Sequence, residues 1–141
     1  MEFALTKYAE QKILNAMLLG EAITFPASWY IALCTADPGR LGDLTNEVAG
    51  GSYIRLSPTF DPAEDDPVSG SYCDSVYDLE WPQATSAWGE ITHIALVDAE
   101  AGGNVWARAE LVDSEGNPAP KQIGLDDIFR IPVGELVVGV D

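Results

Sequence analysis

Residues 90–98 and 104–112 form two apolar segments that a short turn sequence separates. The second segment alternates between small apolar side chains and larger or charged ones, the period expected of a β-strand. The turn ends in Gly102, Gly103 and Asn104. Glycine and asparagine tolerate the positive φ angles that tight hairpin turns require. This stretch therefore predicts an antiparallel hairpin whose first strand is apolar on both faces.

Further short apolar segments follow the same pattern. Strands are predicted at 29–36, where both faces are apolar as in a central strand, at 53–57 and at 74–81. One or two more are expected after Ile123, broken near Pro132 and running to Asp141. Segments 36–52 and 59–71 are predicted as loops, because they are rich in Gly, Pro and Asp. Since strands do not alternate with helices, we expect a mainly β fold: a single antiparallel β-sandwich of seven to eight strands.

One helix is predicted at the N-terminus, over residues 6–19. Apolar side chains recur there every three to four residues, Thr6 can cap the first turn, and Gly20 stands where a helix commonly ends. The apolar stripe is wider than one supporting sheet needs. We therefore predict an attachment helix at 1–20, separable from a β-sandwich domain at 21–141. Its partner-binding residues are predicted to be Tyr8, Ile13, Leu14, Met17 and Leu18.

The charge balance limits the possible partners. Asp and Glu number 23 against 7 Lys and Arg, which gives a net charge of −16. Such a surface repels nucleic-acid backbones, so nucleic acid is not an expected partner. The sequence holds no apolar run of 18 residues and does not begin like a signal peptide. We expect no membrane contact and synthesis in a cytoplasm.

The residues that could support catalysis do not form a recognised pattern. His93 lies on an apolar strand, and no Gly-x-Ser-x-Gly elbow accompanies it. Carboxylate pairs such as Asp126 and Asp127, or Asp74 and Asp78, arise by chance in a chain with 23 acids. We expect a structural histidine, no catalytic residue and no cofactor.

Metal and disulfide chemistry are also not expected. One histidine and two distant cysteines, Cys34 and Cys73, do not make a zinc site. The acids at 61–66 could offer oxygen ligands to calcium, but their spacing differs from that of an EF-hand, so a solvated acidic loop is expected. A pair of cysteines in a cytoplasmic chain is expected to stay reduced, with Cys34 as a small buried hydrophobe.

The four tryptophans, Trp29, Trp81, Trp88 and Trp106, leave two interpretations open. They could stack on sugar rings at the surface, or fill the core or a seam between subunits. We expect Trp88 and Trp106 to be largely buried, because one precedes the longest apolar strand and the other opens its hairpin partner.

Three long strings carry a resemblance to a known family. These are ASWYIALCTADPG at 27–39, NEVAGGSYIR at 46–55 and WPQATSAWGEITHIALVDAEAGGNVW at 81–106. Together with the N-terminal helix and the final short strand, they resemble small bacteriophage virion proteins known as phage tail fiber proteins. The resemblance runs from about residue 5 to Asp141, and segments 57–80 and 113–130 depart from it most.

The resemblance implies a non-enzymatic structural protein of a virion, assembled in the host cytoplasm. The implied role is a tail fibre, spike or baseplate-associated module that forms a symmetric oligomer, with a homotrimer expected. Its implied partners are other virion proteins of the tail, baseplate or capsid. Two alternatives stay open: a capsid decoration protein, and a carbohydrate-binding module that holds host-surface glycans.

Overall fold

The computed structural model describes residues 1–140, which hold one helix and eleven short strands. The helix α1 spans Lys7–Leu19. The strands are β1 (Ala4–Leu5), β2 (Tyr30–Cys34), β3 (Glu64–Asp66), β4 (Gly70–Asp74), β5 (Leu79–Glu80), β6 (Gly89–Ile91), β7 (His93–Val97), β8 (Val105–Glu110), β9 (Lys121–Ile123), β10 (Arg130–Ile131) and β11 (Val137–Val140). Asp141, the predicted end of the last strand, lies outside the described residues.

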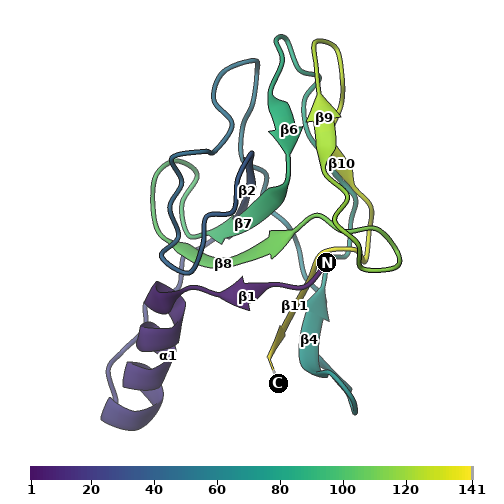
Figure 1. Ribbon diagram of the computed structural model, residues 1–141. Coiled ribbons are helices and arrows are strands. Elements are labelled where there is room, and N and C mark those ends of the chain that lie inside the picture. The colour runs from purple at the N-terminus through teal and green to yellow at the C-terminus, as the bar shows by residue number, and fades with distance from the viewer. Residues whose placement is uncertain (141) are drawn as a thin grey trace.

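The strands form four small sheets, in which every named pair is antiparallel (Figure 1). The largest has the order β1-β8-β7-β2, the next is β11-β4-β3, and β10-β5 and β6-β9 are two-stranded. The prediction of a mainly β, antiparallel fold with one N-terminal helix is confirmed. A single sandwich of seven to eight strands is too simple, because turns and prolines keep many strands to two or three residues and divide them among four sheets.

The hairpin predicted around residues 99–104 is present, and β7 pairs with β8 along its length. Gly102 and Gly103 adopt φ angles of 63° and 76°, the conformation for which the turn needs glycine. The backbone N–H of Asn104 donates to Asp98 Oδ1 at 2.8 Å and closes the turn. The hairpin forms the centre of the four-stranded sheet.

Apolar side chains cover both faces of this sheet. The main core includes Ile31 and Leu33 of β2, while Ala32 and Cys34 of the same strand face a smaller cluster on the opposite side. The prediction that β2 is apolar on both faces is confirmed, but β2 is an edge strand and not a central one. Its outer edge is covered by isolated bridges to Leu56 and Glu47 in the loops that follow.

The segment 53–57, predicted as a strand, is an irregular loop with one bridge residue, Leu56. The reason is Arg55, whose side chain is 4% exposed and turned inward. Its Nε and Nη2 each donate to the Glu47 carboxylate at 2.7 Å. Its Nη1 donates to the carbonyls of Ala99 and Gly102, at 2.8 and 2.7 Å. One buried guanidinium therefore holds the 46–55 loop against the central hairpin.

The acidic segment also differs from its prediction as a loop. Residues 64–66 form β3, which pairs with β4 in a hairpin. Asp66 accepts backbone N–H bonds from Val68 and Ser69 at the turn, so these bonds lower the pKa of its carboxyl. Within the predicted strand 74–81, only Leu79–Glu80 is a strand of its own, while Asp74 ends β4.

The N-terminal residues connect two of the sheets. Ala4 and Leu5 pair with Arg108 and Ala107 of β8, and Glu2 forms a parallel bridge with Val137 of β11. Phe3 is buried in the main core. Deletion of residues 1–20 would therefore remove an edge strand, contrary to the expectation that this segment could be lost without breaking a sheet. The division at residue 20 stays a prediction.

Candidate functional site

Helix α1 is fixed to the sheet at its first turn. The fully buried Thr6 caps the helix, and its Oγ1 accepts from the Ala9 backbone N–H at 3.3 Å and donates to the Val105 carbonyl at 2.6 Å. The Lys7 backbone N–H donates to the Arg40 carbonyl at 2.8 Å. The predicted cap residues Thr6 and Gly20 are both confirmed, with Gly20 left-handed at φ 70°.

An aromatic cluster fastens the helix and the segment after it to β8. Trp106 lies at its centre, with its ring centroid 5.4 Å from Tyr8 and 5.3 Å from Trp29, both edge-on. Phe25 lies 5.8 Å from the same ring. Such edge-to-face pairs add stabilisation beyond the area they bury. The base of the helix is thus firmly packed.

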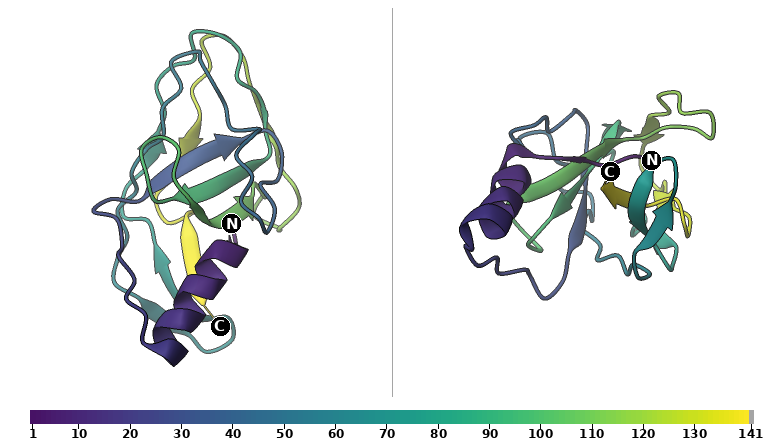
Figure 2. Two further views of the ribbon diagram at one scale, coloured as in Figure 1. Left: turned by 90° about the vertical axis from the view of Figure 1, so that its left-hand side faces the viewer. Right: turned by 90° about the horizontal axis from the view of Figure 1, so that it is seen from below.

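The far half of the helix is apolar and exposed. Leu14, Met17, Leu18 and Leu19 are between 53% and 73% exposed, and Phe25 is 58% exposed. We call the four helix residues, Leu14, Met17, Leu18 and Leu19, the helix-end patch, whereas Phe25 lies beside Trp106 at the base of the helix. Figure 2 shows α1 projecting from the side of the sheets, with its last turns away from the β-strands. A contiguous apolar surface of this kind marks an interaction site, whereas single exposed apolar residues are ordinary.

The predicted partner-binding residues divide between two faces of the helix. Tyr8 packs on Trp106 and Ile13 is half-buried, so these two face inward. Leu14, Met17 and Leu18 point to solvent and belong to the helix-end patch. Sequence reasoning did not include Leu19, which is in the last turn of the helical pattern and could have been found there.

His93 has a polar environment. Its Nδ1 hydrogen-bonds with Thr92 Oγ1 at 2.8 Å, and its Nε2 lies 3.9 Å from a carboxylate oxygen of Asp37 and one of Glu110. Its register partner Cys34 is buried, and burial raises the pKa of that thiol to about 12. A neutral buried thiol is a poor nucleophile. This geometry does not provide the activated cysteine of a Cys–His enzyme.

We predict that His93→Gln changes the free energy of unfolding by no more than about 1–3 kcal/mol, the range for one altered buried polar group. The glutamine amide can still hydrogen-bond with Thr92. Chemical denaturation of the wild type and the variant at one protein concentration measures the difference. A hydrolase activity of the purified protein that disappears in His93→Gln would contradict the structural role.

Metal binding has no built site in the described residues. No group of three or more His, Cys, Asp or Glu side chains between residues 1 and 140 is arranged to hold an ion. Glu64 accepts from the Tyr72 hydroxyl at 3.0 Å, so part of the acidic hairpin is used within the fold. Cys34 and Cys73 are both free thiols in this structure.

Three of the four tryptophans lie in the interior of the fold. Trp81, Trp88 and Trp106 are at most 6% exposed, so the predicted burial of Trp88 and Trp106 is confirmed. The indole N–H of Trp88 donates to the Gly51 carbonyl at 2.9 Å, and that of Trp81 to the Ile54 carbonyl at 2.9 Å. These rings have no free face on which a sugar could stack.

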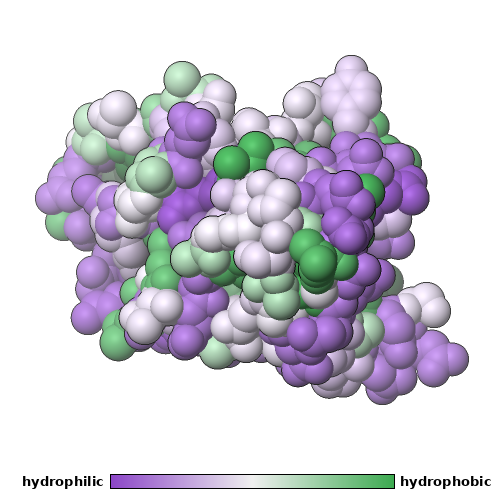
Figure 3. All heavy atoms as spheres, turned by 90° about the horizontal axis from the view of Figure 1, so that it is seen from above, coloured by the Kyte–Doolittle hydropathy of each residue, from purple (hydrophilic) through white to green (hydrophobic). Residues whose placement is uncertain are grey.

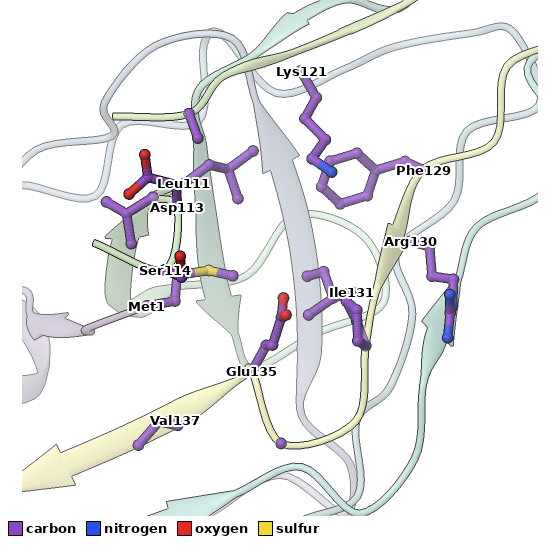
Figure 4. A pocket seen from close by; sticks show the side chains of 14 residues that line it. Met1, Leu111, Asp113, Ser114, Lys121, Phe129, Arg130, Ile131, Glu135 and Val137 are labelled. Atoms are coloured by element: carbon purple, nitrogen blue, oxygen red, sulfur yellow. The ribbon is translucent and has the colours of Figure 1, made fainter. Parts of the chain in front are cut away.

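A surface cavity of about 620 Å³ lies between the N-terminus, the β8–β9 loop and the β10–β11 segment (Figure 4). Leu111, Phe129 and Ile131 give it an apolar wall, and Asp113 and Lys121 bring charged groups to it. Its lining includes neither histidine nor cysteine.

Comparison with known proteins agrees with this picture of a scaffold. The family model described as Podophage GP4 fiber I protein gp80 matches residues 4–139, nearly the whole chain. None of the curated proteins matches the chain. In the part of the chain that the structure describes, no helix is long and apolar enough to cross a membrane. The chain belongs to the Podophage GP4 fiber I protein gp80 family of phage fiber proteins, which are structural, non-enzymatic components of the virion.

Proposed function

We propose that this chain is a tail fibre or baseplate-associated module that assembles as a homotrimer and is fixed in the virion through helix α1. The observation that carries the proposal is the helix-end patch, an apolar surface on a helix whose base is locked to the central sheet by Thr6 and Trp106. A rigid base with an uncovered apolar end suits permanent attachment to a partner. The β-sheets are then free to extend outward.

The site chemistry favours this role over the other classes. The thiol of Cys34 is buried, so it does not offer His93 an exposed nucleophile. Three of the four tryptophans are buried, which removes the main reason to propose a tryptophan-based glycan site. Attachment to other virion proteins is the role that uses the exposed apolar end of helix α1. Figure 3 shows that the face opposite the end of the helix is mostly hydrophilic, with apolar residues in small separate groups.

An epitope label tests where this chain lies in the assembled virion. The loop at 113–117 is exposed and closed by its own Asp113, whose carboxylate accepts from Glu115 and Asn117 N–H groups, so it can carry a short epitope inserted after Glu115. Electron microscopy of antibody-labelled virions is expected to show label at the tail. Label on the head lattice would instead indicate the capsid decoration role, and unlabelled particles would refute a place in the virion.

Charged substitutions in the helix are expected to block incorporation. Leu14→Glu combined with Leu18→Glu adds charge to the helix-end patch but leaves the buried Thr6 and Trp106 contacts intact. We expect at least a tenfold loss from particles, the effect of about 1.4 kcal/mol. Virions made in cells that supply only the variant are measured by quantitative mass spectrometry.

The matched control is Leu125→Glu, because Leu125 is similarly exposed but lies in the loop between β9 and β10, far from α1 (Figure 1). It should incorporate normally. Normal incorporation of the double helix variant would show that another surface anchors the protein, with the 36–52 loop and the acidic β3–β4 hairpin as the next candidates.

A further inference from the structure

We draw no further inference here: the strongest candidate, the surface cavity between the N-terminus, the β8–β9 loop and the β10–β11 segment, carries none because its lining brings acidic and basic side chains together in equal number and nothing in the structure shows what would occupy it.

Discussion

Arg55→Ala is expected to destabilise the protein by about 3–5 kcal/mol, the effect of removing one partner of a buried ion pair. The substitution deletes both hydrogen bonds to the Glu47 carboxylate and leaves that group, 16% exposed, without its cation. It also releases the Ala99 and Gly102 carbonyls that Arg55 binds. The free energy of unfolding from urea denaturation, at one fixed protein concentration, measures the loss.

Arg55→Lys is the matched control for this prediction. Lysine keeps the charge, but its single ammonium cannot make the two-pronged contact with Glu47 and also reach two carbonyls. We therefore expect an intermediate loss of stability. Arg108→Ala offers a second comparison, since Arg108 is only partly buried and lies 3.7 Å from Asp37. Equal effects of Arg55→Ala and Arg108→Ala would contradict the role of the Arg55 network.

Trp106→Ala is expected to reduce stability by about 3–5 kcal/mol, the usual range for truncating a large buried aromatic residue. It should also loosen helix α1, because Trp106 provides the ring on which Tyr8, Trp29 and Phe25 pack. Hydrogen exchange of the α1 amides measures the second effect separately from global stability.

Trp88→Ala tests whether loosening of helix α1 is specific to the loss of Trp106 or accompanies any loss of global stability. Trp88 is as buried as Trp106, but it contacts Tyr53 and not the helix. We expect Trp88→Ala to lower the free energy of unfolding about as much as Trp106→Ala does. The α1 amides should then exchange faster only through global unfolding and not through local opening of the helix. If both variants loosen the helix equally, the aromatic cluster is not what holds it.

The elements that local sequence determines were predictable. The helix needs only its apolar period, Thr6 and Gly20, and the central hairpin needs alternation and two glycines. Both follow from interactions between residues close in sequence. The break near Pro132 falls between β10 and β11 for the same kind of reason.

The elements that depend on distant contacts were not predictable. Polar and apolar side chains alternate in segment 53–57 as in a strand. Arg55, however, binds partners that are 8 to 47 residues away, and the backbone around it does not form a continuous strand pairing. The composition of the acidic segment predicts a loop. It forms a strand because β4 pairs with it, and β4 is itself paired with β11. Such tertiary contacts override local preference.

The exposure of the predicted partner-binding residues agrees with the structure for three of the five, and their role in binding stays a prediction. The width of the helical stripe indicated a second partner, and Leu14, Met17 and Leu18 are indeed exposed. The stripe could not reveal that Tyr8 and Ile13 face inward, because that depends on where the helix leaves the sheet. After Gly20 the chain returns toward Trp106, so Phe25 packs at the base of the helix and not at its exposed end.

The junction between β1 and α1 has a mechanical consequence. β1 ends at Leu5, α1 begins at Lys7, and the single residue between them, Thr6, is fully buried. A pull on the helix therefore acts at once on the β1–β8 pairing and on the Trp106 cluster, with no slack segment to absorb it. We therefore expect α1 to be rigidly coupled to the β-sheets and to transmit torque and tension to them directly. Single-molecule stretching from α1 should show no soft extension before the first unfolding event.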